Sequence, residues 1–280
     1  MSGEWACAES IFHPVSASLG ERVIRDAYMH ICEHYVSVFC LASETHITTR
    51  LLMTQAIVVG VLALQGAFIE HIKLFQAATK KIPGHEFSFI EVRTANQLKT
   101  CQALVIPGGE STAMSHIAQR TGMIEPLMEF IKSERPVWGT CAGLIFLSKQ
   151  LVNGKPEQTI LGALNIEVTR NAFGRQLQSF SSDLDFSSFI EGVTDFPTIF
   201  IRAPVVTKAP ADKHVTDSKV IQAPFDYNNE SPLEVLHKLD TGLIVAVRQG
   251  QVLGTSFHPE LGDDSRFHQW FLQEFVLASI

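Results

Sequence analysis

One cysteine stands in a setting that suits a nucleophile. Cys141 lies in the run Gly139-Thr140-Cys141-Ala142-Gly143, between an apolar stretch and a helical pattern. A nucleophile flanked at two positions by glycine is typical of the sharp strand-to-helix turn called a nucleophile elbow. The small residues permit the turn, and the N-terminus of the following helix favours a thiolate. An ordinary buried cysteine is the alternative, and the motif alone leaves both interpretations open.

A histidine and a glutamate two residues apart could serve that cysteine. His258-Pro259-Glu260 follows a predicted strand over 251–256. Residues at i and i+2 of an extended segment project to the same side, so Glu260 would orient the imidazole of His258. His258 would then take and return a proton, as in a catalytic triad. His71 and His116 lie on predicted helices without such a partner, and we expect both to be exposed or partly buried.

A glycine-rich turn offers hydrogen-bond donors for the same reaction. The run Pro107-Gly108-Gly109-Glu110-Ser111 ends one predicted strand and begins a helix. In an open α/β sheet, ligands bind in the crevice outside such strand ends. The backbone N–H groups of Gly109 and Ala142 would there stabilise the oxyanion of a tetrahedral intermediate. Alone the run is a weak signal, because Ser111 could merely cap the helix.

The elements that must position these residues follow from an alternation of apolar strands and helices. Fully apolar strands that alternate with helices are typical of a parallel sheet covered on both faces. We therefore predict an α/β fold with an open, mostly parallel sheet and helices on both faces. The predicted strands span 57–64, 87–92, 103–106 and 136–139, and the predicted helices run to about 78, from 111, over 123–133 and over 142–151.

The second half of the chain predicts more strands with short connections. Gly250 separates the last two strands and predicts a tight hairpin. The polar stretch 208–229 is interpreted as an inserted surface loop. Residues 1–52 have a helix-like pattern but no recognisable chemistry, so we predict an N-terminal extension, ordered or disordered. The predicted strands span 164–169, 198–203, 243–248 and 251–256, and the last helix spans 264–277.

Composition excludes several functional classes. The chain has 280 residues and a net charge of −7 without a cluster of Lys or Arg, so no nucleic-acid partner is expected. No apolar run reaches the roughly 20 residues of a membrane-spanning helix, and no membrane partner is expected. The five cysteines contain no C-x-x-C pair, which predicts neither a disulfide framework nor a zinc site. Without a secretory signal, a cytoplasmic location is expected.

With these residues in view, the sequence resembles the class I glutamine amidotransferases. Within that class it is similar to the PdxT/SNO family, the glutaminase subunits of pyridoxal 5'-phosphate synthase, over about residues 57–275. The cysteine and His-Pro-Glu elements are shared by the whole class, whereas the Gly-Gly-Glu-Ser, Asn-x-Phe-Gly-Arg-Gln and Ile-Arg-Ala-Pro runs indicate the vitamin B6 family. The matching runs are 60–67, 107–112, 139–144, 170–176, 201–204 and 256–261.

The resemblance implies a role for each matching residue. Cys141 would attack the side-chain amide of L-glutamine, His258 would act as general base and acid, and Glu260 would orient His258. Residues 53–280 would form the glutaminase domain, and its ammonia would pass to a synthase subunit in a hetero-oligomer. No cofactor or metal is implied for this chain. Residues implied to hold the substrate are Gly109, Glu110, Ser111, Arg170, Ile201 and Arg202, and the oxyanion donors are Gly109 and Ala142.

Other interpretations of the same residues remain. The chain could be another cysteine hydrolase on a related sheet, such as a peptidase, which the Gly-Gly-Glu-Ser and His-Pro-Glu runs disfavour. It could be a non-catalytic regulatory partner of the synthase, although all three triad residues are present. An amidotransferase of histidine or nucleotide synthesis is disfavoured by the family-specific runs.

Overall fold

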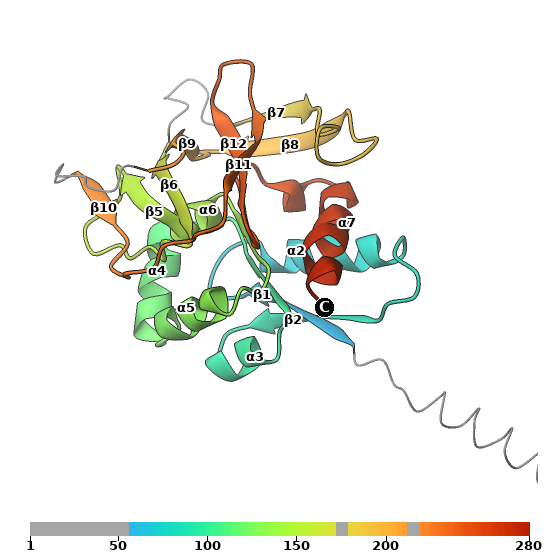
Figure 1. Cartoon of the computed structure of the whole chain (residues 1–280), viewed down its shortest axis with the longest axis horizontal. Coiled ribbons are helices and arrows are strands. Elements are labelled where there is room, and N and C mark those ends of the chain that lie inside the picture. The colour runs from blue at the N-terminus through green and yellow to red at the C-terminus, as the bar shows by residue number, and fades with distance from the viewer. Residues whose placement is uncertain (1–55, 172–178, 212–218) are drawn as a thin grey trace, which may run out of the picture. The chain divides into compact units, whose positions relative to one another are not determined.

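The computed structural model describes residues 56–171, 179–211 and 219–280 (Figure 1). The predicted extension over 1–52 and part of the predicted insertion over 208–229 lie outside the described residues. No helix in the described ranges is long and apolar enough to cross a membrane.

Five neighbouring strands form the parallel part of the main sheet. Most residues of β1, β3, β4 and β13 are buried, because helices cover both faces of these strands. The prediction of an open α/β sheet of parallel strands with helices on both faces is confirmed. In spatial order the strands are β2 (Phe87–Val92), β1 (Ile57–Leu62), β3 (Ala103–Ile106), β4 (Val137–Thr140) and β13 (Val252–Thr255).

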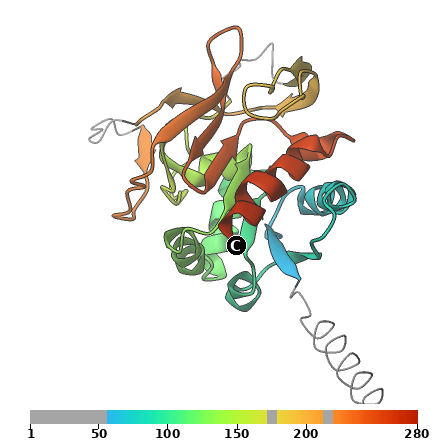
Figure 2. The same cartoon turned by 45° about the vertical axis from the view of Figure 1, so that its right-hand side comes forward.

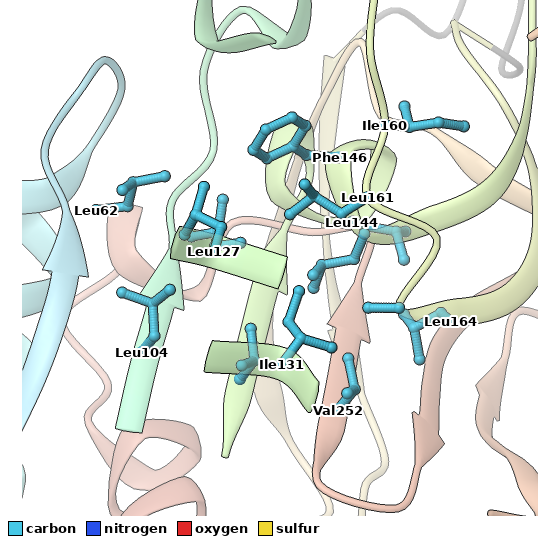
Figure 3. Close-up of a cluster of buried hydrophobic side chains, with 14 of the residues drawn as sticks. Leu62, Leu104, Leu127, Ile131, Leu144, Phe146, Ile160, Leu161, Leu164 and Val252 are labelled. Atoms are coloured by element: carbon cyan, nitrogen blue, oxygen red, sulfur yellow. The ribbon is translucent and has the colours of Figure 1, made fainter. Parts of the chain in front are cut away.

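Side chains alternate between two hydrophobic cores, one on each face of the sheet. Leu104 and Ile106 of β3 face one core, whereas Ala103 and Val105 face the other. Figure 3 shows the first core, where Leu127 of α5 lies close to Leu104. The helices on this face are α3 (Ala95–Lys99), α4 (Ser111–Arg120), α5 (Ile124–Lys132) and α6 (Ala142–Leu147).

The opposite face carries α2 (Phe68–Thr79) and α7 (Arg266–Phe271). The two helices pack beside each other in both views (Figures 1 and 2). After α7 the chain continues as a π-helical turn over Leu272–Val276 and a 3-10 turn over Leu277–Ser279. The predicted helix over 264–277 is therefore present, but its second half is not α-helical.

The rest of the main sheet is mixed. β12 (Ile244–Gln249) pairs antiparallel with β13 through the predicted hairpin, in which Gly250 has φ +59°. A separate two-stranded sheet contains β7 (Ser179–Leu184) and β8 (Phe196–Ile201). Beyond β12 the order is β9 (Val205–Lys208), β6 (Leu164–Thr169), β5 (Ser148–Val152) and β10 (Val220–Gln222), and β11 (Leu233–Lys238) also pairs with β12.

Two sequence-based predictions of local structure need correction. The predicted helix over 142–151 ends at Leu147, and the residues after it form β5. The hydroxyl of Ser148 donates to the carbonyl oxygen of Ile145 at 2.7 Å, which closes the last helical turn. The predicted loop over 208–229 contains β10, which pairs antiparallel with β5, because β5 would otherwise leave an unpaired edge there.

Candidate active site

The carboxyl ends of adjacent strands bring the predicted catalytic residues together. Cys141 directly follows β4, and His258 follows β13, the neighbour of β4. The backbone N–H of Cys141 donates to the carbonyl oxygen of Thr255 at 2.8 Å, so the two segments leave the sheet side by side. Open α/β sheets bind ligands at this edge.

The backbone at Cys141 has the strain of a nucleophile elbow. Its φ of +46° and ψ of −96° lie outside the regions that an L-residue ordinarily occupies. A Cβ at Gly139 would lie 2.6 Å from the backbone of Gly143, and a Cβ at Gly143 would lie 2.1 Å from the carbonyl oxygen of Ile106. Both glycines are therefore required, because they let α6 pack directly against β3 and β4.

His258 is held between Glu260 and Cys141. Its Nδ1 lies 2.8 Å from Glu260 Oε1, and both side chains are buried. The imidazole also lies near the Cys141 side chain. Burial by itself lowers the pKa of His258, but the hydrogen bonds and charges of Cys141 and Glu260 raise it to about 10. A histidine held by a carboxylate beside a cysteine is the arrangement in which the imidazole can act as that cysteine's base.

The local backbone around His258 differs from the expected extended segment. β13 ends at Thr255, and Pro259–Leu261 form a 3-10 turn that begins directly after His258. The side chains of His258 and Glu260 therefore meet across a turn rather than on one side of a strand. The backbone N–H of His258 donates to the carbonyl oxygen of Ile199 at 2.8 Å, which ties this turn to β8.

The glycine-rich turn after β3 packs against the imidazole. A Cβ at Gly108 would lie 2.3 Å from Cε1 of His258, so only glycine lets the ring approach. The carbonyl oxygen of Gly108 accepts from the N–H of Ala67 at 3.0 Å. The N–H of Gly109 belongs to the same trans peptide group as this carbonyl and therefore points in the opposite direction, away from Ala67. Ala142 is the first residue of α6, and its N–H has no acceptor within the helix.

Glu110 and Arg170 meet at the start of α4. The Glu110 carboxylate accepts from the N–H groups of Thr112 at 3.2 Å and Ala113 at 2.6 Å. Arg170 Nη2 lies 3.3 Å from Glu110 Oε1. Burial would raise the pKa of Glu110, but the backbone hydrogen bonds and the Arg170 charge lower it. Glu110 is thus an anion next to a cation at the mouth of the site.

A glutamine that no motif indicated joins the predicted substrate residues. Gln158 Nε2 donates to the hydroxyl of Ser111 at 3.1 Å, and its Oε1 accepts from Arg170 Nη1 at 3.3 Å. The same Nη1 donates to the hydroxyl of Thr112 at 3.2 Å. Gln158 lies in the connection between β5 and β6, where the sequence has no catalytic pattern.

The last two predicted substrate residues follow β8. The carbonyl oxygen of Ile201 lies 3.9 Å from Cys141 Sγ, which places this strand end at the nucleophile. Arg202 is exposed and has φ +45°. The rest of the run after Asn171, residues 172–176, lies outside the described residues. In the described ranges, no three His, Cys, Asp or Glu side chains form a group that could hold a metal ion.

The expectation for His71 was wrong. The side chain of His71 is completely buried rather than exposed or partly buried, and its Nε2 lies 3.5 Å from Glu260 Oε2. The helix α2 directs this residue into the core behind the triad, because its apolar face packs on the sheet. His116 is partly buried, as predicted.

Comparisons with known proteins agree with this geometry. The sequence profile of the SNO glutamine amidotransferase family matches residues 61–277. The chain is 47% identical over 222 residues to pyridoxal 5'-phosphate synthase subunit SNO1 of Saccharomyces cerevisiae, which covers 78% of this chain and 93% of that protein. It is 41% identical over 215 residues to pyridoxal 5'-phosphate synthase subunit PdxT of Herpetosiphon aurantiacus, which covers 76% of this chain and 98% of that protein. A crystal structure of a glutamine amidotransferase is similar with a TM-score of 0.58 and 41% identity, over 77% of this chain and 97% of that chain.

Proposed function

The chain belongs to the SNO glutamine amidotransferase family, and we propose that it hydrolyses L-glutamine to glutamate and ammonia through Cys141, His258 and Glu260. We further propose that the ammonia passes to the synthase subunit of a pyridoxal 5'-phosphate synthase. The observation that carries the proposal is the buried contact of His258 with both Glu260 and Cys141 at the carboxyl edge of the sheet.

The proposed reaction has two halves that both use His258. The Cys141 thiolate attacks the side-chain amide carbon, and His258 gives its proton to the nitrogen that leaves as ammonia. The resulting thioester is attacked by water, from which His258 removes a proton, and glutamate leaves as sulfur is restored. In both steps a tetrahedral intermediate forms, and its negatively charged oxygen would accept from the N–H groups of Gly109 and Ala142. In comparable sites one such donor contributes roughly 10²- to 10³-fold to the rate.

The charged pair beside the glycine-rich turn suits an amino-acid substrate. The planar guanidinium of Arg170 can pair bidentately with the α-carboxylate, while Glu110 can accept from the α-ammonium group. Gln158 and Thr112 would hold Arg170 in place, and Ser111 would hold Gln158. Ile201 would face the substrate with its carbonyl oxygen, and Arg202 would lie at the rim.

The setting of the reaction is also a proposal. We assign the glutaminase domain to residues 53–280, and a chain that begins at Met53 would then retain activity. The relatives SNO1 and PdxT are subunits of pyridoxal 5'-phosphate synthase, which supports a hetero-oligomer with a synthase subunit. The free thiols of Cys101 and Cys141 fit a reducing compartment such as the cytoplasm.

The proposal is tested by measuring ammonia and glutamate release from L-glutamine, with and without the synthase subunit. The Cys141→Ala variant should lose at least about 10³-fold in rate, because the nucleophile acts as one unit with its base. Cys101→Ala is the matched control, since Cys101 is also a free, buried cysteine but lies outside the site, and it should retain the rate. Undiminished release by Cys141→Ala would exclude the mechanism.

A further inference from the structure

One oxygen of the Glu260 carboxylate is not engaged by the triad. Glu260 Oε1 pairs with His258, whereas Oε2 is buried and has no hydrogen bond of ordinary geometry within the described residues. A buried charged oxygen without a donor is destabilising, because it loses its hydrogen bonds to water and gains none in the protein. A second histidine faces this oxygen, since Nε2 of His71 lies 3.5 Å from Oε2.

His71 is itself part of a buried pair of imidazoles. Its Nδ1 lies 2.9 Å from Nε2 of His268, and its Nε2 lies 3.3 Å from the hydroxyl of Thr140. The two histidines come from α2 and α7, and neither is accessible to solvent. Phe75 and Trp138 pack against both rings.

The apolar surroundings decide the charge of this pair. Burial lowers the pKa of His71 to about 3, although the charge of Glu260 opposes the shift, and burial also lowers the pKa of His268 to about 3. Both rings are therefore neutral near pH 7, and each carries a single N–H. The contact of His71 with Glu260 therefore joins a neutral ring to a carboxylate and is not an ion pair.

The contacts select one arrangement of the two protons. If His71 carried its proton on Nδ1, a lone pair on Nε2 would face the Glu260 carboxylate. His268 would then hold its proton on Nδ1, which has no hydrogen-bond partner among the described residues. The opposite arrangement leaves only an acceptor unpaired, which proteins tolerate better than a buried donor. In it, His268 donates to His71 Nδ1, and His71 Nε2–H faces both Thr140 and Glu260.

We propose that His71 is a positioning residue that donates its Nε2–H to Glu260 and so holds the carboxylate against His258, and that His268 keeps His71 in the required tautomer. This inference rests on the proposed function, since it concerns the same triad. The distance of 3.5 Å is long for a hydrogen bond, and catalytic hydrogen bonds of substrate-free enzymes commonly tighten when substrate binds. The relay would then extend from His268 through His71 and Glu260 to His258.

Three substitutions at position 71 separate positioning from simple packing. In His71→Gln the amide nitrogen reaches the place of Nε2, whereas in His71→Asn it reaches only the place of Nδ1. His71→Leu fills space but donates at neither place. The assay uses the full chain with its synthase subunit. We expect the His71→Leu and His71→Asn variants to have a kcat for glutamine about 10- to 100-fold below that of the wild type, because the loss of an outer hydrogen-bond partner has an effect of this size in comparable sites. KM should stay within about 2-fold, because His71 does not contact the substrate, and Gln should restore most of kcat.

The matched control and the order of variants keep this inference separate from the proposed function. His116→Leu alters another helix histidine away from Glu260 and should leave kcat unchanged. If the wild type hydrolyses glutamine and Cys141→Ala does not, but His71→Leu matches the wild type, the inference alone fails. The inference also fails if the His71→Gln and His71→Asn variants have equal melting temperatures and equally lowered kcat. Should the Leu variant not fold, the comparison of Gln with Asn still decides, because both carry the same amide.

Discussion

At the scale of single residues, the proposed role of Cys141 depends on neighbours that have no reactive group of their own. Gly139 and Gly143 allow the backbone to hold Cys141 at φ +46°, and Gly108 allows His258 to pack on the glycine-rich turn. Strained backbone of this kind costs about 1–3 kcal/mol and persists only where the surrounding structure enforces it. The spacing of small residues around the cysteine is therefore as much a part of the site as the triad.

The pH dependence of glutamine hydrolysis should report the support that Glu260 gives to His258. The raised pKa of His258, about 10, keeps the imidazole protonated until the pH rises toward that value. In Glu260→Gln the negative charge is lost, so the pKa of His258 should fall and the basic limb of the kcat/KM profile should move to lower pH. We expect kcat to fall by up to about 10⁴-fold, as it does when a triad carboxylate is replaced by its amide.

The measurement is a kcat/KM profile from pH 6 to pH 10.5 for both proteins. A basic limb at the same pH in Glu260→Gln and in the wild type would show that Glu260 does not control the protonation of His258.

Sequence patterns identify those site residues that lie in short runs. Cys141, His258 and Glu260 each stand in a run with a mechanical reason for its spacing. His71 and His268 stand in no such run, and they meet across 197 positions of the sequence. Their contact is created only when α2 and α7 pack on the same face of the sheet, so local spacing contains no signal for it. The same holds for Gln158, which lies in an irregular connection.

At the scale of elements, the close approach of α6 to the sheet should be sensitive to a single methyl group. A Cβ in Gly143→Ala would lie 2.1 Å from the carbonyl oxygen of Ile106, so α6 must move away from β3. We expect a loss of about 1–3 kcal/mol in the free energy of unfolding, as overpacking usually causes. Hydrolysis should also fall, because Cys141 directly precedes this helix.

Urea unfolding of Gly143→Ala and of Gly262→Ala provides the comparison. A Cβ at Gly262 would have no neighbour closer than 4.0 Å, and its φ of −96° suits alanine. Equal stability of the two variants would contradict the requirement for glycine at position 143.

Elements with a strong local pattern are predicted well, and edge elements are not. The boundaries of β2, β3 and β6 match the sequence-based prediction. β3 is a short apolar run that ends before Pro107, whereas apolar and polar residues are interspersed in β2 and β6, which is typical of strands. β5 follows α6 without an intervening Gly or Pro, and its sequence therefore predicts a continuation of the helix. β10 has three residues within a polar stretch, and only its pairing with β5 makes it a strand.

At the scale of the whole molecule, both faces of the sheet contribute to the site. α6 and α4 on one face position Cys141 and part of the proposed substrate site, whereas α2 and α7 on the other face hold His71 and His268 behind Glu260. The triad therefore lies where the two hydrophobic cores meet at the end of the sheet. A substitution in either core that shifts a helix should therefore also shift the side chains of the proposed triad.

Global stability should fall in mild acid because of the two buried imidazoles. The pKa values of His71 and His268 are lowered to about 3 by burial, whereas an exposed histidine has a pKa near 6.5. Below about pH 6.5 these two imidazoles bind protons in the unfolded chain but not in the folded chain, so their contribution to stability is largest above that pH and falls as the pH decreases. Each imidazole contributes up to about 1.4 kcal/mol per pH unit.

Denaturant unfolding between pH 7 and pH 5 measures this effect. A double variant, His71→Gln with His268→Leu, lacks both imidazoles and should lose less stability over that range than the wild type. Equal slopes for the two proteins would show that the buried pair is not the source of the acid sensitivity.

The central claim, that Cys141 is the nucleophile toward glutamine, is tested most directly by covalent labelling. A glutamine analogue with a chloroketone in place of the side-chain amide leaves a stable thioether on the sulfur that attacks it. We predict one adduct by intact mass, located on Cys141 by peptide mapping among the five cysteines of the chain, formed more slowly in excess glutamine and in step with loss of ammonia release. Inactivation with the adduct on any other cysteine would contradict the claim.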